Sequence, residues 1–139
     1  MLHAERIKRI LLKNKRITEQ KWQELFEKAQ ATETDLISLV TLHHFIEKNE
    51  LYEFLAQDLG VEFIDLKTTP LDPKTLDLLP LEVMRADKIV VFGFKKPFYQ
   101  VATVDPDDLQ TLDFIRKKLG QDIKIFLTSD EAIASVIEE

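Results

Sequence analysis

Residues 101–139, VATVDPDDLQTLDFIRKKLGQDIKIFLTSDEAIASVIEE, contain the pattern that decides the fold of this chain. The opening apolar run precedes Asp105-Pro106, a typical helix start, and the amphipathic stretch that follows ends at Gly120. A second apolar run, Ile123–Leu127, is followed by Ser129, a favoured N-cap residue for a final helix. The order strand, helix, strand, helix predicts two parallel strands joined by a crossover helix.

The stretch before this pattern adds further strand and helix signals. Val61–Leu66 is a short apolar run, and Asp72-Pro73 repeats the cap-and-proline start of a helix. Lys88–Phe94 and Pro97–Val104 are rich in β-branched and aromatic residues, and their short connection predicts a hairpin. Residues 61–139 are therefore predicted to form a small α/β subdomain with a mixed sheet of three to four strands.

The first half of the chain contains an internal repeat. A shift of 29 positions aligns apolar residues of the two copies: Ile7 with Leu36, Ile10 with Leu39, Ile17 with Ile46, Trp22 with Leu51, Leu25 with Phe54 and Phe26 with Leu55. Each copy is predicted to be a helix pair, first Ala4–Lys15 with Glu19–Gln30, then a pair that opens at Thr34-Asp35 and ends at Gly60. Because one pair cannot bury its apolar stripe alone, the copies should pack together as a helical subdomain over residues 1–60. The predicted fold class is α+β, two repeated helix pairs followed by the α/β subdomain.

Composition excludes several classes of protein. No run approaches the roughly 18 apolar residues of a membrane span, and the N-terminus lacks the apolar core of a signal peptide, so we expect a cytoplasmic protein. The absence of cysteine excludes disulfides, thiolate catalysis and sulfur-ligated zinc. With 3 glycines and no Gly-x-x-x-x-Gly-Lys-Ser/Thr loop, the sequence offers nothing to cradle a triphosphate. Helix capping explains the cluster of Asp105, Asp107 and Asp108, so we expect no metal site there. Because catalytic motifs are also missing, we expect no cofactor and no enzyme activity.

Charge is unevenly distributed along the chain. The first 16 residues carry +5, which leaves −11 on the remainder (−6 minus +5). On a helix, four cations fall on one face, opposite Ile7, Ile10 and Leu11. These four cations are Arg6, Arg9, Lys13 and Arg16. The stripe is either a solvated face or a docking surface for an acidic partner, whereas nucleic acid is disfavoured because the acidic remainder would repel phosphates.

Three segments in this order and spacing resemble the N-terminal domain of the ATPases that drive type II secretion and type IV pilus assembly. They are LGVEFIDL at residues 59–66, LLPL at residues 78–81 and the pattern at residues 101–139, and the resemblance covers most of the chain from Ile17 onward. The resemblance implies a non-catalytic module that docks the ATPase on the cytoplasmic part of an inner-membrane platform protein, and that reaches the membrane only through this partner. The chain's own ATPase domain would be its second partner. A stand-alone adaptor with the same fold is an alternative.

A further alternative is a sensor of cyclic di-GMP. In some members of the family each repeat copy begins with Arg-Leu-Gly, and the two copies together wrap this nucleotide. Here the first triplet is Arg6-Ile7-Lys8, which keeps the arginine but loses the glycine. The second is Asp35-Leu36-Ile37, which places a carboxylate where a phosphate requires a cation. Because Arg6, Lys8, Asp35 and Ile37 form a degenerate site, nucleotide binding is predicted to be lost.

Overall fold

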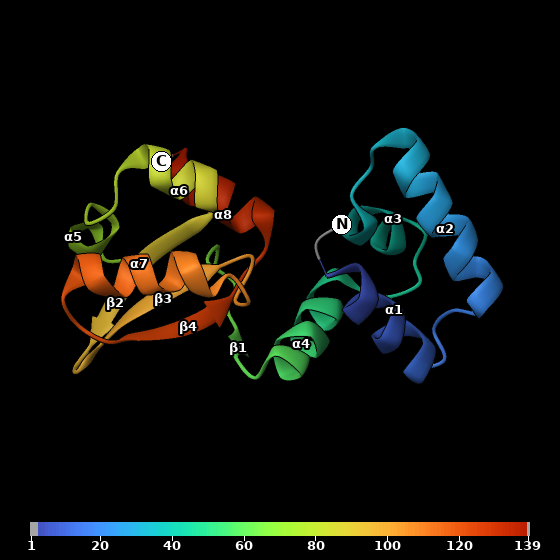
Figure 1. Cartoon of the computed structure of the whole chain (residues 1–139), viewed down its shortest axis with the longest axis horizontal. Coiled ribbons are helices and arrows are strands. Elements are labelled where there is room, and N and C mark those ends of the chain that lie inside the picture. The colour runs from blue at the N-terminus through green and yellow to red at the C-terminus, as the bar shows by residue number, and fades with distance from the viewer. Residues whose placement is uncertain (1–2, 139) are drawn as a thin grey trace. The chain divides into compact units, whose positions relative to one another are not determined.

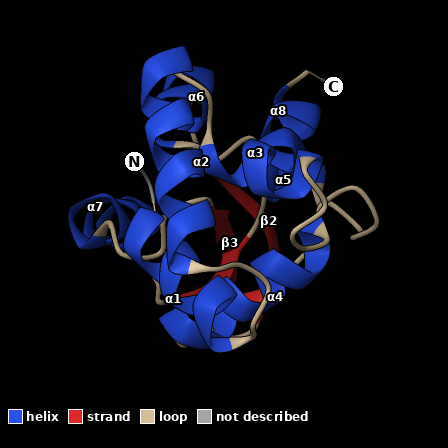
Figure 2. Cartoon of the chain, turned by 90° about the vertical axis from the view of Figure 1, so that its right-hand side faces the viewer, coloured by secondary structure: helices blue, strands red, loops and turns tan. Residues whose placement is uncertain are grey.

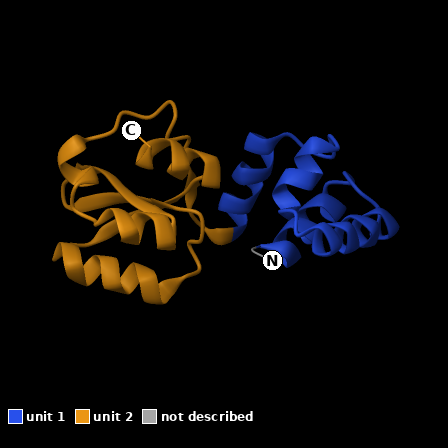
Figure 3. Cartoon of the chain, turned by 90° about the horizontal axis from the view of Figure 1, so that it is seen from above, with its two compact units in different colours: residues 1–58 blue, residues 59–139 orange. Residues whose placement is uncertain are grey.

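The computed structural model describes residues 3–138 and divides the chain into two compact units, Met1–Asp58 and Leu59–Glu139 (Figure 3). The helices of the first unit are α1 (Ala4–Lys13), α2 (Glu19–Thr32), α3 (Leu36–Leu42) and α4 (Lys48–Leu59) (Figure 1). The second unit contains β1 (Glu62–Phe63), α5 (Pro73–Leu76), α6 (Leu81–Asp87), β2 (Ile89–Lys95), β3 (Phe98–Thr103), α7 (Leu109–Leu119), β4 (Ile123–Leu127) and α8 (Asp130–Ile137) (Figure 1). Figure 2 distinguishes helices, strands and loops by colour. This content confirms the predicted α+β class. None of these helices has the length and apolar character needed to cross a bilayer.

The two helix pairs of the first unit follow one another at an offset of 29 residues. α1 and α3 end at Lys13 and Leu42, and α2 and α4 begin at Glu19 and Lys48. Most of the aligned apolar positions are buried inside the unit, and Ile7, Leu36, Leu51 and Leu55 are among those no more than 1% exposed. The helices therefore bury one apolar stripe per pair against the other pair, as expected for a repeat whose single copy has no core of its own.

The backbone also turns in the same way after α1 and α3. Lys15 and His44 both adopt left-handed φ angles, 57° and 61°. The matching closing hydrogen bonds run from the Arg16 N–H to the Leu11 carbonyl at 2.8 Å and from the Phe45 N–H to the Val40 carbonyl at 3.0 Å. At the other end of the unit, α4 runs into Gly60, whose φ of 74° is the left-handed conformation that glycine adopts without strain.

The second unit is built on a four-stranded sheet in the order β1-β4-β3-β2. β2 and β3 form the predicted antiparallel hairpin, and β4 pairs in parallel with both β3 and β1. α7 covers one face of the sheet through Leu112 and Ile115, while α8 packs Ala132 and Ile133 on the other face together with Leu66. The predicted mixed sheet and the parallel strands on either side of α7 are confirmed.

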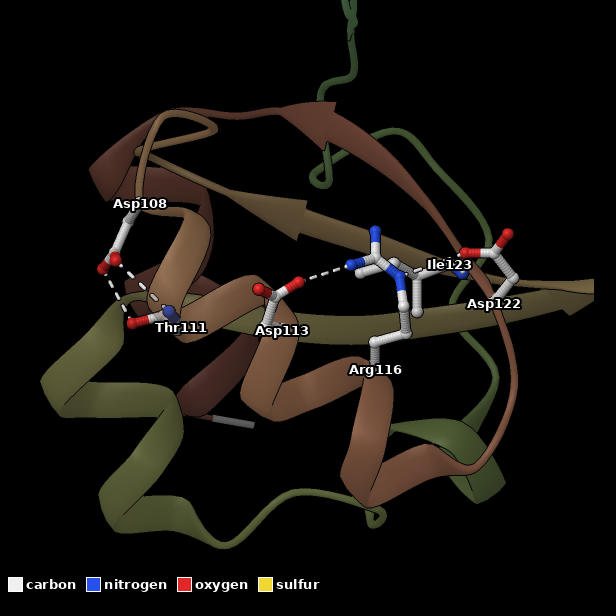
Figure 4. Close-up of polar contacts among 6 residues, drawn as sticks. All are labelled: Asp108, Thr111, Asp113, Arg116, Asp122 and Ile123. Carbon is white, nitrogen blue, oxygen red and sulfur yellow. Dashed lines mark hydrogen bonds and ion pairs between the residues drawn. The ribbon is translucent and has the colours of Figure 1, made fainter.

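Two details of the second unit differ from the prediction. α7 begins at Leu109 with Asp108 as N-cap, because Asp105 accepts a hydrogen bond from the Asp107 N–H and forms a turn before the helix. Asp108 caps through the N–H and the hydroxyl of Thr111 (Figure 4). The second difference is α6, a helix that the sequence analysis did not expect. It has seven residues and none of them is buried, and so short a segment shows no apolar periodicity.

Two buried threonines at the ends of β3 and β4 generate a stability prediction. The Thr103 hydroxyl accepts a hydrogen bond from the Asp105 N–H at 3.1 Å, whereas the Thr128 hydroxyl has no partner among the described residues. We expect Thr128→Val to raise the free energy of unfolding by about 1 kcal/mol, because it removes a buried hydroxyl without a partner. We expect Thr103→Val to lower it by about the same amount, because it leaves the partly buried Asp105 N–H unpaired. Urea unfolding of the two variants checks this, and equal destabilisation by both would contradict it.

Candidate docking surface

The predicted stripe consists of Arg6, Arg9 and Lys13 on α1 and Arg16 in the turn that follows, whereas Ile7, Ile10 and Leu11 of the same helix are buried. These cations are not a bare stripe, however, because three of them are paired with carboxylates of α4. Asp58 accepts hydrogen bonds from Nη1 of Arg6 at 2.5 Å and from Nη2 of Arg9. Arg16 forms a two-point pair with Glu50, with nitrogen to oxygen distances of 3.0 and 2.8 Å.

The order of these pairs shows that α1 and α4 run antiparallel. The start of α1 meets the end of α4 at Asp58, and the turn after α1 meets the start of α4 at Glu50. Asp58 lies at the negative end of its helix dipole and Arg6 at the positive end of its own, so each charge is unfavourable within its own helix. Pairing the two removes both penalties and fixes the register of α1 on α4.

The pairing changes the electrostatics of Asp58. Hydrogen bonds from Arg9 and Arg6 lower the pKa of its carboxyl below the ordinary value of 3.8. Its side chain is 25% exposed, and that of Arg9 is 56% exposed, so water screens the interaction considerably. The pair therefore orients the helices more than it stabilises them.

The remaining cations of this segment differ in their partners. Lys8 forms an ion pair of 2.9 Å with Glu19 at the start of α2, and this hydrogen bond raises the pKa of the lysine. Lys13 and Lys15 are exposed and have no ion-pair partner within residues 3–138. The four cations of the predicted stripe face two carboxylates, which leaves a net charge of +2 on this surface. Lys13 also lines an open hollow of about 710 Å³ together with Lys8, Arg9 and Glu19.

The degenerate nucleotide positions have other roles in the structure. Arg6 is held by Asp58, and Lys8 by Glu19. Asp35 is the N-cap residue of α3 and accepts from the Ser38 hydroxyl at 3.4 Å. Ile37 is 7% exposed and belongs to the core. The polar groups at three of these positions thus have partners within the chain, and the fourth side chain is withdrawn from the surface.

Sequence reasoning did not identify Asp58 and Glu50 as the partners of the arginines. Each pair joins residues at least 34 positions apart, so no local pattern could establish it.

Comparison with known proteins defines the class. Residues 59–139 match the MshEN domain, and because this is more than half of the chain, the chain belongs to the MshEN domain family. The predicted kinship with the N-terminal domains of secretion and pilus ATPases is thereby confirmed.

Among individual relatives, the chain is 26% identical over 133 residues to the type IV pilus assembly ATPase PilB of Myxococcus xanthus (strain DK1622). The match covers 96% of this chain but 24% of PilB, so the chain spans about a quarter of this relative's length. The fold resembles that of MshE with cdg, with a TM-score of 0.75 at 20% identity over 95% of this chain and 96% of that one. It also resembles the N-terminal domain of XpsE, with a TM-score of 0.65 at 22% identity over 97% of this chain and 94% of that one.

The Asp58 pairs generate a pH-dependent prediction. A carboxyl whose pKa is lower in the folded than in the unfolded chain stabilises the fold above pH 3.8, and this contribution is lost as the pH falls through the lowered pKa. We expect Asp58→Asn to lower the free energy of unfolding by about 0.5 to 1 kcal/mol at neutral pH, and the difference from wild type to shrink in acid.

Urea unfolding over a series of pH values measures this difference. Glu53→Gln is the matched control, because Glu53 is an exposed carboxylate of α4 without an ion-pair partner among the described residues. A Glu53 variant as destabilised as the Asp58 variant, or a difference independent of pH, would contradict the assigned role of Asp58.

Proposed function

We propose that this chain is a non-catalytic docking domain of a secretion or pilus-assembly ATPase, and that it binds the cytoplasmic part of an inner-membrane platform protein. One observation supports the proposal most directly. The fold of this chain matches that of the N-terminal domain of XpsE over 97% of this chain and 94% of that domain. The far longer relative PilB is an ATPase, and the 139 residues of this chain contain no phosphate-binding loop. The domain would work in the cytoplasm, beside the membrane that holds its partner.

The exposed side of α1 is the proposed contact surface. Its paired arginines are held in fixed positions by Asp58 and Glu50, while the unpaired Lys13 and Lys15 are free to meet carboxylates of a partner. A net charge of +2 within an otherwise acidic chain favours an acidic partner surface, and such complementarity acts mainly on the rate of association.

The structure determines which variants test this surface. Arg9 is a poor choice, because its reversal would also break the pair with Asp58 and affect stability. Lys13→Glu/Lys15→Glu avoids that problem, and we expect it to weaken binding to the cytoplasmic domain of the platform protein about tenfold at low salt and less at high salt. Surface plasmon resonance at two ionic strengths measures both affinity and association rate.

Lys117→Glu/Lys118→Glu on α7 is the matched control, since it changes the net charge equally and, like Lys13 and Lys15, these lysines are exposed and have no ion-pair partner among the described residues. We expect this control to bind like wild type within about twofold. Equal weakening by both double variants would show that the effect comes from net charge alone. Unchanged binding of the Lys13/Lys15 variant would show that α1 is not part of the interface.

A second candidate function is binding of cyclic di-GMP. The fold favours it, because the TM-score to MshE with cdg, 0.75, is higher than the 0.65 to the N-terminal domain of XpsE. The residues argue against it, because Arg6 is paired within the chain and Asp35 and Ile37 replace the second arginine and glycine. The domain fold is compatible with either function, so the triplet residues decide between them.

We therefore expect no saturable binding of cyclic di-GMP with a dissociation constant below about 10 μM, which corresponds to roughly −7 kcal/mol. Isothermal calorimetry on the full chain measures this directly. A one-to-one isotherm in that range would instead establish the chain as a nucleotide sensor. Asp58→Asn serves as an internal check, since freeing Arg6 should not create micromolar binding while Asp35 remains.

A further inference from the structure

A second surface, in the α/β unit, carries unpaired lysines of its own. A hollow of about 710 Å³ opens beside the β2–β3 hairpin and is lined by residues of β1, β2, β3, β4 and the hairpin turn. We call it the hairpin hollow and define it by Glu62, Phe92, Lys95, Lys96, Phe98 and Lys124. No residue of α7 or α8 is among those that line it.

The floor of the hairpin hollow is aromatic. Phe92 and Phe126 contact each other edge to face with centroids 5.4 Å apart, and both are almost fully buried. Phe98 at the rim is 37% exposed. A partner that covered Phe98 would gain apolar burial on binding, and the nearly buried floor would add van der Waals contact.

A free amide group also faces this hollow. At the irregularity in the β2–β3 pairing, Gly93 lies opposite Gln100, and a Cβ atom at Gly93 would come within 2.6 Å of the Gln100 Oε1. Glycine thus allows the Gln100 side chain to lie against the strand backbone. The half-buried Gln100 amide has no hydrogen-bond partner among the described residues, so it can bind a peptide group of a ligand.

The charges around the hollow oppose those of the rest of the unit. Residues 59–139 carry 10 cations and 15 carboxylates, a net charge of −5 (10 minus 15). Within the hollow, Lys124 is neutralised by Glu62 at 3.0 Å and lies over the Phe126 ring. Lys95 and Lys96 at the hairpin turn are exposed and have no ion-pair partner in the described part of the chain.

This combination suits a peptide better than a nucleotide. The hollow has no arginine to fork a phosphate, and Glu62 would repel one. Phe92 and Phe126 are almost fully buried, so they expose too little ring surface for a base to stack on. In a peptide, an apolar side chain can contact the aromatic floor. Carboxylates on either side of it can form ion pairs with Lys95 and Lys96.

We propose that the hairpin hollow binds a peptide segment of a protein partner in which an apolar side chain is flanked by acidic ones. This inference rests on the proposed docking function, because it adds a second contact surface for the partner and specifies the peptide chemistry that this surface binds.

The test uses the full ¹⁵N-labelled chain and the unlabelled octapeptide GDEFLDEG as probe, with GKKFLKKG as the charge-reversed control. We expect saturable shifts of the Phe98, Gln100 and Lys124 resonances with the acidic peptide only. Lys95→Glu/Lys96→Glu should weaken this binding at least tenfold. Lys117→Glu/Lys118→Glu, an equally exposed lysine pair on α7, is the matched control and should bind like wild type.

Three results would overturn the inference: no saturation by about 1 mM peptide, equal binding of the basic peptide, or shifts of the same resonances by cyclic di-GMP. Parallel binding of wild type and variants to the platform domain separates this inference from the proposed function. If the platform domain binds and the acidic peptide does not, only the hollow assignment fails. If the peptide binds as expected and the platform domain does not bind wild type, the proposed function fails and the hollow serves a different partner.

Discussion

Mutual burial of short helices is the constraint on which the first unit depends. Its helices have 10, 14, 7 and 12 residues, lengths at which isolated helices are marginal or unstable in water. Each must therefore bury its apolar stripe against the others, and the 29-residue offset supplies two matching stripes. Once α1 has placed Ile7, Ile10 and Leu11 in this core, its cationic side can only face outward. The exposed basic surface is thus a consequence of how the core is built.

The carboxylates of α4 then set how much of that charge is available. Asp58 and Glu50 fix three arginines by hydrogen bonds, which limits their freedom and reduces the net charge of the surface. Among the exposed lysines without an ion-pair partner in the described residues are Lys13 and Lys15 on the basic surface and Lys95 and Lys96 at the hairpin hollow. Because the chain as a whole carries −6, long-range attraction to an acidic partner is weak, and recognition has to rely on local patches of this kind.

Local signals in the sequence were sufficient for most of the fold. Ser129 caps α8 through the Ala132 N–H, and the three runs rich in apolar residues form β2, β3 and β4, as predicted. The start of α7 could not be predicted, because Asp105 and Asp108 are equally good caps and the choice depends on the turn between them.

The candidate surfaces were less accessible to sequence reasoning than the fold. The basic residues of α1 could be found by helical periodicity, but their partners lie 34 to 52 residues away and are determined only when α1 packs on α4. The hairpin hollow depends on the irregular pairing at Gly93, which no sequence pattern revealed. Lys95 and Lys96 by themselves indicated only a solvated turn.

The central claim is that this domain docks an ATPase on a membrane-anchored partner. The most direct measurement is a titration of the ¹⁵N-labelled chain with the unlabelled cytoplasmic domain of the platform protein, followed by NMR. The account predicts saturable binding, with the largest shifts around Lys13 on the exposed side of α1 and around Gln100 in the hairpin hollow. Absence of binding by about 1 mM, or shifts confined to α2 and α7, would contradict it.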